Sequence, residues 1–377
     1  MRFPEFSGEW KCTTIGNIGD IKNGPFGSVL HAEDYVENGI PIVTTEHFKT
    51  GLMPSDKFGI PQVSNEDYIR LKGYRLETND IVFSRVGSVD INAHVGIEQN
   101  GWLFSGRVLR VRPKYDIDSL FLHYALSTEA VKRDIRNRAV GQTMPSINTP
   151  ILSSTTIQLP KDLFEQKKVA HFLRLLDERI ITQNKIIEDL KKLKSAIRKK
   201  VFVSLKEEHT ECCEINQLLT YEQPTAYIVT NDEYSTDTTL IPVLTANKGF
   251  VLGYTDEDFG IYQKGECIIF DDFTMDAKYV SFPFKVKSSA IKMLTAKPNV
   301  NLRFMFEYLS YLELKSEEHK RHYISEIASL VVELPSKEMQ NKIASLMTSL
   351  DNKLALEENT SVRYEDEKQY LLSQMFI

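Results

Sequence analysis

The sequence contains few of the residues, and none of the short motifs, from which common catalytic centres are built. It has 4 cysteines, Cys12, Cys212, Cys213 and Cys267, without a CxxC pair or a histidine at metal-ligand spacing. This pattern favours reduced thiols over a disulfide framework or a zinc site. The 8 histidines are scattered along the chain, so we expect structural or solvated roles for them.

Motifs for nucleotide, hydrolase and metalloprotease chemistry are also missing. The chain has no GxxxxGK[ST] loop, no GxGxxG after a strand, no HExxH and no GxSxG. It also lacks the Asn-Pro-Pro-aromatic tetrapeptide that amino-methyltransferases use. Asp271 and Asp272 follow an apolar strand and could form a paired-carboxylate metal site, but an acidic pair there more often forms a turn and cap. The sequence therefore predicts a chain without an active site of its own.

Long hydrophobic runs and an excess of positive charge are absent as well. No apolar stretch approaches the roughly 18–20 residues that a membrane-spanning helix needs, and the N-terminus shows no signal-peptide core. We therefore expect a cytoplasmic protein without a membrane partner. The 377 residues are 42% hydrophobic and 26% charged, as in ordinary proteins of two or three domains. The net charge of −6 does not by itself indicate nucleic-acid binding, so the local distribution of charge matters more.

One long element is present twice. The segments 166–202 and 340–376 correspond at a constant sequence offset of 174, and a Leu-Pro pair ending at Pro160 or Pro335 precedes each of them. In both copies apolar residues recur in alternating steps of four and three, which is the period of a coiled coil. Neither copy contains glycine or proline. Such widely spaced copies predict the duplication of a unit of about half the chain.

Charge favours pairing of these two predicted helices with each other. Residues 161–206 contain 13 Lys/Arg and 6 Asp/Glu, a net charge of +7, whereas residues 336–377 contain 5 and 7, a net charge of −2. Opposite charges attract, and a globular segment between the helices makes an antiparallel pair the natural geometry. Glu357 and Ser361 are polar interruptions of the second apolar seam.

The globular segments that precede the helices also resemble each other. Residues 240–245 (LIPVLT) repeat 39–44 (GIPIVT) at an offset of 201, and 265–270 (GECIIF) repeat 79–83 (NDIVF) at an offset of 187. Because the offset falls to 174 at the helices, the second unit is predicted to have lost about 27 residues from its loops. The fold class is α+β, with two mixed α/β domains separated by two long helices that form an antiparallel coiled coil. The predicted segments are a first globular domain (1–155), a first helical spacer (156–206), a second globular domain (207–334) and a second helical spacer (335–377).

Basic stretches without acidic residues occur in both globular segments. Residues 102–115 contain four Lys/Arg and residues 277–306 contain six, with no Asp or Glu in either stretch. Lys and Arg can contact DNA phosphates while Asn, Gln, Ser and Thr read base edges. A solvated charged face is the alternative for either stretch alone. Two such stretches at corresponding places favour nucleic-acid binding.

Several motifs in a defined order carry a family resemblance. They are the opening segment 2–10, the loop 22–28 (KNGPFGS), 83–88 (FSRVGS), 221–225 (YEQPT), 270–274 (FDDFT), 286–289 (VKSS) and the two Leu-Pro-introduced helices. With these motifs the chain resembles the specificity (S) subunits of type I restriction-modification systems. The resemblance implies two target recognition domains, each of which reads one half of a split site in double-stranded DNA. It further implies that the paired helices dock two methyltransferase (M) subunits and that restriction (R) subunits join the complex.

The resemblance also implies that this subunit has no catalytic residues and no cofactor or metal site. S-adenosylmethionine, ATP and magnesium are expected on the partner subunits. Residues in loops and at strand ends are predicted to bind DNA. In the first domain these are Lys22, Asn23, Phe26, Ser28, Ser84, Arg85, Ser88, Arg107, Gln142 and Asn148. In the second domain they are Gln223, Thr225, Asn247, Lys248, Thr274, Lys287, Ser288, Lys320 and Arg321.

Two other classes of function are compatible with the sequence. The chain could be a stand-alone DNA-modifying enzyme with an unrecognised active site, and turnover by the pure protein would favour that hypothesis. It could also be a coiled-coil scaffold that binds other proteins but not DNA. Salt-dependent DNA binding would distinguish a DNA reader from such a scaffold.

Overall fold

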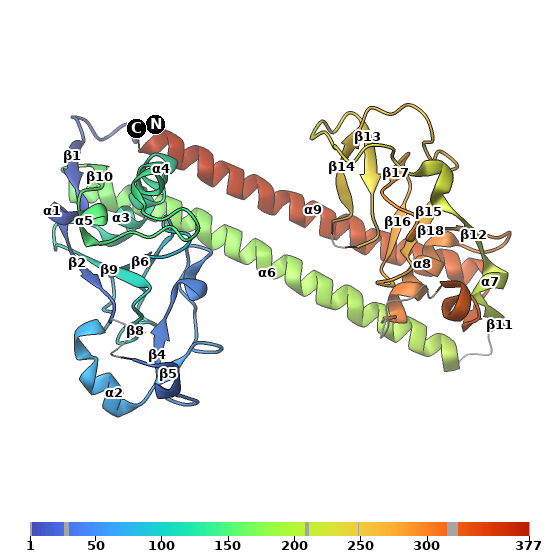
Figure 1. Ribbon diagram of the computed structural model, residues 1–377, viewed down its shortest axis with the longest axis horizontal. Helices are drawn as coiled ribbons and strands as arrows, with labels where there is room; N and C mark the ends of the chain where they lie inside the picture. The colour runs from blue at the N-terminus through green and yellow to red at the C-terminus, as the bar shows by residue number, and fades with distance from the viewer. Residues whose placement is uncertain (1, 26–29, 208–210, 248, 315–322, 377) are drawn as a thin grey trace. The chain divides into compact units, whose positions relative to one another are not determined.

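The chain folds into two compact units that share two long helices. The computed structural model describes residues 2–25, 30–207, 211–247, 249–314 and 323–376. Unit 1 comprises residues 1–183 and 360–377, and unit 2 comprises residues 184–359. Helix α6 (Leu163–Glu207) begins in unit 1 and ends in unit 2, whereas α9 (Lys337–Met375) begins in unit 2 and ends in unit 1 (Figure 1).

Unit 1 contains two four-stranded sheets and a two-stranded ribbon. The first sheet is antiparallel, in the order β2 (Gly19–Asn23), β9 (Val108–Pro113), β6 (Ile81–Ser84) and β7 (Asn92–His94). The second has the order β3 (Tyr35–Val36), β5 (Gln62–Val63), β4 (Ile40–Val43) and β8 (Leu103–Phe104), with β4 and β8 parallel. The ribbon pairs β1 (Lys11–Thr14) with β10 (Thr156–Leu159), the strand that leads into α6.

Short helices complete unit 1. They are α1 (Ile15–Ile18), α2 (Asn65–Arg70), α3 (Ser119–Leu126), α4 (Glu129–Arg138), α5 (Thr149–Ser153) and the 3₁₀ turns Ala32–Asp34, Thr45–Phe48 and Lys72–Tyr74. Residues 119–138 thus form two helices, α3 and α4, and not one. Between them the Ser127 hydroxyl donates to the carbonyl of His123 (2.8 Å) and the Thr128 hydroxyl to that of Ala125 (2.9 Å). Such side-chain bonds to the backbone compete with continued helix.

The central strand β6 is apolar up to its last residue because both of its faces are covered. Ile81 and Phe83 face a core that includes Phe121 of α3, whereas Val82 faces a second core with Phe48 and Phe104. Side chains alternate between the faces of a strand, so an apolar strand of this kind needs a hydrophobic layer on each side. This arrangement explains the apolar motif at the end of 79–83.

Unit 2 repeats the topology of unit 1 with shorter connections. Its antiparallel sheet has the order β12 (Leu219–Glu222), β18 (Ile291–Ala296), β15 (Cys267–Asp271) and β16 (Ala277–Val280). Its second sheet has the order β14 (Val251–Thr255), β13 (Ile241–Leu244) and β17 (Lys285–Val286), with β13 and β17 parallel. The ribbon pairs β11 (Glu211–Glu214) with β19 (Val331–Leu334). The helical elements are α7 (Ile215–Leu218), a 3₁₀ turn (Pro224–Tyr227), α8 (Leu302–Tyr311) and a π turn (Tyr323–Ile327).

This correspondence confirms the predicted α+β class and the duplication. The strand order β2-β9-β6-β7 matches β12-β18-β15-β16, and each unit contains one parallel strand pair and one ribbon. The echo of 39–44 in 240–245 falls on the equivalent strands β4 and β13. The predicted boundaries after residues 155, 206 and 334 stay predictions, because the compact units divide both long helices between them.

Helices α6 and α9 run antiparallel within each unit. The ion pairs between them are Asp177–Lys368 in unit 1, and Lys191–Glu358 and Lys194–Asp351 in unit 2. Residue numbers fall along α9 as they rise along α6. The predicted seam consists of the residues reached from Val169 to Val201, and from Ile343 to Met375, in alternating steps of four and three. Each of these residues is buried or half-buried. The predicted antiparallel coiled coil is confirmed, and Ser361 is buried within it.

Candidate nucleic-acid interface

A buried glutamine joins each long helix to its α/β layer. Gln166 and Gln340 are both 1% exposed and follow the Leu-Pro pairs. Gln166 donates from Nε2 to the carbonyl of Pro160 (3.0 Å) and accepts from the Asp118 amide (2.9 Å). Gln340 makes the same two bonds, to the Pro335 carbonyl (2.9 Å) and from the Asn301 amide (2.9 Å). A buried amide with both ends bonded fixes the helix relative to the layer.

The residues that Gln166 and Gln340 hold are themselves helix caps. Asp118 accepts from the Phe121 amide (2.8 Å) at the start of α3, and Asn301 accepts from the Phe304 amide (2.9 Å) at the start of α8. Asp and Asn are favoured at this position because they satisfy a free helix N–H group. These capped helices correspond at a sequence offset of 183. They are the structural reference by which the two units can be compared.

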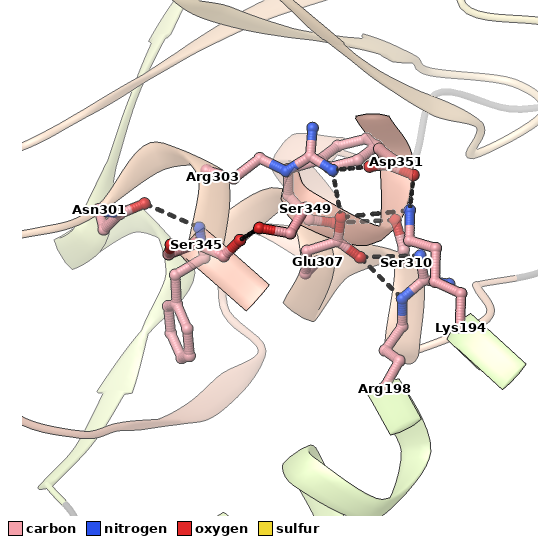
Figure 2. Close-up of polar contacts among 11 residues, drawn as sticks. Lys194, Arg198, Asn301, Arg303, Glu307, Ser310, Ser345, Ser349 and Asp351 are labelled. Carbon is pink, nitrogen blue, oxygen red and sulfur yellow. Dashed lines mark hydrogen bonds and ion pairs between the residues drawn. The ribbon is translucent and has the colours of Figure 1, made fainter. Parts of the chain in front are cut away.

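In unit 2 the long helices meet α8 through a buried group of charges, which we call the Glu307 cluster (Lys194, Arg198, Arg303, Glu307 and Asp351; Figure 2). The Glu307 carboxylate is 0% exposed and accepts from Arg198 Nε (2.8 Å) and Arg303 Nη2 (2.6 Å). Asp351 forms ion pairs with Lys194 and Arg303. Three elements far apart in sequence are thus joined by charge-assisted bonds.

In unit 1 the equivalent junction is the Tyr124 cluster (Tyr124, Asp177 and Lys368). The Tyr124 hydroxyl donates to Asp177 Oδ2 (2.7 Å), and Lys368 Nζ lies 2.5 Å from Asp177 Oδ1. Burial, and after it the negative charge of Asp177, raises the pKa of Tyr124 well above its ordinary value, so the phenol stays protonated. A neutral hydrogen-bond donor stands here where unit 2 has a carboxylate.

The structure gathers most of the predicted DNA-binding residues of unit 1 along one edge of its sheets. Lys22 and Asn23 end β2, Ser84 ends β6, and Arg85 follows it. The loop 140–148 lies against the same edge, because Gly87 N donates to Pro145 O (2.8 Å) and Ile147 N to Arg85 O (2.9 Å). This loop carries Gln142 and Asn148, and both are exposed. Polar groups from separate segments therefore lie together where these strands end.

Two predicted residues of this edge have other contacts. Ser84 is 0% exposed, and its hydroxyl donates a hydrogen bond to the Val86 carbonyl (3.4 Å). Asn148 caps α5 by accepting from the Ile151 amide (3.0 Å), although its side chain is exposed. Ser88 and Arg107 are exposed, while Phe26 and Ser28 lie outside the described residues. Roles of all these residues in DNA binding stay predictions.

A cavity opens at the same edge, where several strands end. This strand-end pocket has a volume of about 460 Å³ and is lined by Pro25, Leu30, Tyr35, Thr44, Arg85, Ser105, Gly106 and Arg107. Arg85 donates from Nη1 to the carbonyl of Gly106 (3.1 Å). Arg107 is exposed. Two predicted DNA-binding residues thus line one concave site.

Glycines let the walls of the strand-end pocket come together. A Cβ on Gly24 would lie 1.9 Å from the carbonyl oxygen of Ser105, and one on Gly106 would lie 2.2 Å from that of Pro25. Only glycine permits such close approach of two backbones. This packing explains Gly24 in the motif 22–28, although the sequence alone did not reveal its partner.

In unit 2 the predicted residues lie at corresponding strand ends. Asn247 follows β13, and Lys287 follows the parallel strand β17, whose end is tied to β13 by the bond from Lys287 N to Leu244 O (3.1 Å). Gln223, Thr225 and Thr274 are exposed, Ser288 is half-buried, and Lys248, Lys320 and Arg321 lie outside the described residues. These assignments also stay predictions.

The acidic pair after β15 forms a turn and a buried ion pair. Asp271 Oδ1 accepts from the amides of Phe273 and Thr274, both at 2.9 Å. Asp272 lies 3.3 Å from Lys292 Nζ, and both side chains are 1% exposed. Turn formation, the alternative to a metal site, is confirmed for Asp271. In the described part of the chain, no group of three or more His, Cys, Asp or Glu side chains could hold a metal ion.

The residues that sequence reasoning missed are those whose partners come from other segments. Glu307 belonged to no motif, and Arg303 was counted with the basic stretch 277–306, although it pairs with Glu307 and Asp351. The constant offset of 174 does link Asp351 to Asp177 and Lys194 to Lys368. Alignment of the two caps would have shown that Glu307 replaces Tyr124.

Among the described residues, none of the helices has a stretch of sufficient length and hydropathy to span a bilayer.

Comparison with known proteins identifies a single family for both halves of the chain. A model of the type I restriction modification DNA specificity domain matches residues 7–192 and again residues 209–363. The specificity subunit of the type I restriction enzyme EcoR124I/EcoR124II from Escherichia coli is 41% identical over 142 residues. That match covers 36% of this chain and 35% of the E. coli protein, so it spans about a third of the relative.

Other relatives match over nearly the whole length. The MjaX specificity subunit of Methanocaldococcus jannaschii is 26% identical, covering 98% of this chain and 93% of that protein. The crystal structure of the type I restriction-modification S subunit from M. genitalium has a TM-score of 0.66 at 16% identity and covers 100% of this chain and 99% of that one. A chain from a structural study of type I R-M complex assembly has a TM-score of 0.58 at 12% identity, with 99% and 98% covered. The structural matches support the fold.

Proposed function

The chain belongs to the family of type I restriction modification DNA specificity domains, and we propose that it is the DNA sequence-recognition subunit of a type I restriction-modification complex. One observation carries this proposal: two units of the same topology, each matched by the specificity-domain model, are built on different halves of one helix pair. Two recognition units in one chain match a DNA target that consists of two half-sites. Each unit reads one half-site of double-stranded DNA through its strand-end loops.

The long helices are proposed to dock two methyltransferase subunits. Both carry apolar side chains outside the buried seam, and Phe172 (40% exposed) and Leu346 (44% exposed) stand at equivalent positions, related by the same sequence offset of 174. Further exposed apolar side chains recur along both helices, at Leu175, Ile181 and Leu193 of α6 and at Leu356 and Val362 of α9. Extended apolar surface, unlike single exposed residues, marks protein-binding sites. Equivalent positions in the two units suit two copies of one partner. Restriction subunits join that complex.

We assign no catalytic step to this chain. S-adenosylmethionine, ATP and magnesium belong to the partner subunits, and the chain contributes sequence reading and positioning. Because its target is the DNA of the cell, we also propose a cytoplasmic location.

Reconstitution tests the proposal. The chain would be purified alone and together with a methyltransferase subunit of a type I system, and modified bases would be mapped by sequencing of treated DNA. We expect modification only with both proteins, at a motif of two half-sites separated by a fixed spacer. Methyl transfer by the chain alone would contradict the assignment, and a single uninterrupted motif would contradict reading by two units.

A matched pair of variants tests the docking surface. Phe172→Asp and Leu346→Asp place a charge on the proposed surface, and Glu358→Gln, at an exposed ion pair on α9, is the control. We expect each Asp variant to lose one methyltransferase subunit in sedimentation analysis and the double variant to lose both. Full assembly by the double variant would place the docking surface elsewhere.

A further inference from the structure

The strand-end pocket of unit 1 has the composition of an anion site. Thr44 follows β4, Arg85 follows β6, and Ser105 to Arg107 connect β8 with β9, so strand ends from both sheets converge on it. Two of its described lining residues are arginines and none is acidic, in a chain with a net charge of −6. Hydroxyl groups of Tyr35 and Thr44 supply further donors. A local positive site in an acidic protein indicates a negatively charged ligand.

Arg85 is held in place with unused hydrogen-bond donors. Its backbone amide donates to the Arg107 carbonyl (2.9 Å), and its Nη1 donates to the Gly106 carbonyl (3.1 Å). Its Nε is buried and has no partner among the described residues. Because the Nε atom is closed off from solvent, a ligand in the pocket would meet the guanidinium through its terminal nitrogens. The charge and planar shape of this group match the oxygens of a phosphate or carboxylate.

The recessed position of Arg85 distinguishes between the parts of DNA. Base edges lie inside the grooves and are reached by side chains that project from a protein, whereas backbone phosphates lie on the outside of the duplex. A half-buried arginine at the wall of a concave pocket suits the protruding group. The exposed Arg107 lies at the rim, where a second cation can contact the same phosphate.

Unit 2 lacks the two arginines of this site among its described residues, although the exposed Lys287 stands where unit 1 has Ser105. The bond from Arg85 N to Arg107 O corresponds to the bond from Asp272 N to Ala290 O (3.0 Å), so these pairs occupy equivalent positions. Asp272 is buried and paired with Lys292, and Ala290 has no charge. Both arginines of unit 1 are therefore replaced in unit 2.

We propose that the strand-end pocket of unit 1 binds one backbone phosphate of the DNA through Arg85 and Arg107, an arginine pair that the described residues of unit 2 do not repeat. This inference rests on the proposed function, because it assumes that the strand-end loops face DNA. The bound phosphate fixes the position of unit 1 on its half-site without contributing to base selection.

Neutralisation of single phosphates tests the site in the complete methyltransferase complex. Duplexes that carry the specific target would each contain one methylphosphonate, at successive positions through both half-sites. For the wild type, one position in one half-site should weaken binding by roughly tenfold. With Arg85→Ala, the same methylphosphonate should have no further effect, and the slope of log affinity against log salt should fall by about 1. Arg107→Ala should give the same pattern with a smaller change.

Two further variants serve as controls. Arg85→Lys retains the charge but not the planar fork, so it should keep the salt slope while binding weakens. Arg70→Ala removes an exposed arginine of α2 that pairs with Asp67, away from the pocket, and should leave the methylphosphonate profile unchanged. Thermal unfolding would show that each variant is folded. Arg107→Ala and Arg85→Lys keep the test valid if Arg85→Ala does not fold.

Each alternative result has a defined meaning. If folded Arg85 variants bind all duplexes as the wild type does, the pocket is not a DNA contact. If they relax the preference for one base pair and keep the phosphate sensitivity, Arg85 reads a base and the phosphate assignment is wrong. A wild-type complex that shows no preference for any DNA sequence would instead overturn the proposed function itself.

Discussion

The two units solve the same structural problem, the attachment of an α/β layer to paired helices, with different chemistry at the centre of the junction. Unit 1 places the neutral Tyr124 hydroxyl against Asp177 and Lys368. Unit 2 keeps an aspartate and a lysine at the equivalent positions but has the carboxylate of Glu307 where Tyr124 would be. The ion pair between the helices is thus common to both units, and the layer-to-helix contact is not.

Where Glu307 stands in place of Tyr124, the residues that contact it differ from those of unit 1 as well. The positions equivalent to Arg303 and Arg198 in unit 1 are Leu120 and Leu372, at sequence offsets of 183 and 174. A buried carboxylate without cations would be strongly destabilising, and so would the arginines without an acceptor. We therefore expect Leu120, Tyr124 and Leu372 of unit 1 to form one matched set, and Arg303, Glu307 and Arg198 of unit 2 to form the other. A change within a set should be costly, whereas exchange of the whole set should not.

The largest expected effect is that of removing the central charge of unit 2. Glu307→Gln keeps the shape but removes the acidic partner of Arg198 and leaves Arg303 and Lys194 with Asp351, which should cost about 3–5 kcal/mol. Tyr124→Phe removes one hydrogen bond to a carboxylate that keeps Lys368, and should cost about 1–2 kcal/mol. Urea unfolding with hydrogen exchange would show the loss in peptides of unit 2 and unit 1, respectively.

An exposed acid on α9 provides the control for that experiment. Glu358 pairs with Lys191 at the surface (2.7 Å), and Glu358→Gln should change the stability little because water screens this pair. If Glu307→Gln cost no more than Tyr124→Phe, the charged centre would not be the critical element of the unit 2 junction.

A smaller difference is expected in the response of the units to acid. In unit 1, burial lowers the pKa of His123 from 6.5 to about 3. The contribution of the neutral, buried His123 to the free energy of unfolding is therefore present above pH 6.5 and is lost as the pH falls toward 3. In unit 2, burial raises the pKa of Glu257, but the hydrogen bonds from Lys285 and Thr230 outweigh burial. Together these effects lower the pKa from 4.5 to about 2. Its contribution is present above pH 4.5 and is lost as the pH falls toward 2. Unit 1 should therefore weaken first during acidification.

Variants without these titratable groups measure the two contributions. His123→Phe, which introduces the residue found at the equivalent position 306, should flatten the dependence of unfolding free energy on pH between about 6.5 and 5. Glu257→Gln should leave that interval unchanged and flatten the dependence below pH 4.5. A wild-type slope that survives His123→Phe would assign the acid sensitivity to other groups.

The smallest effect is expected for exchange of the complete set. Arg198→Leu, Arg303→Leu and Glu307→Tyr together give unit 2 the residues of unit 1 and leave the pair Lys194–Asp351 in place. Because exchange of a buried ionic group for apolar residues is often close to neutral, the triple variant should lie within about 1–2 kcal/mol of the wild type. A triple variant less stable than Glu307→Gln would show that the sets are not interchangeable.

The sequence by itself determined the duplication, the α+β class and the antiparallel pairing of the long helices. The repeat offset of 174 and the alternating apolar period are linear patterns, and a helix buries the residues that such a period places on one face. The Leu-Pro-glutamine signal also marked both helix starts, although the bonds of Gln166 and Gln340 that give it meaning became visible only in the structure.

Only the tertiary structure decided which distant residues meet. Arg198, Glu307 and Asp351 come from three helices, so no spacing along the chain relates them, and the burial of Glu307 depends on how α8 packs. The strand-end pocket likewise depends on the contact of Gly24 with Ser105, which the order of residues does not encode locally. A linear pattern specifies an element through its period, whereas a site formed from several segments exists only after those elements pack together.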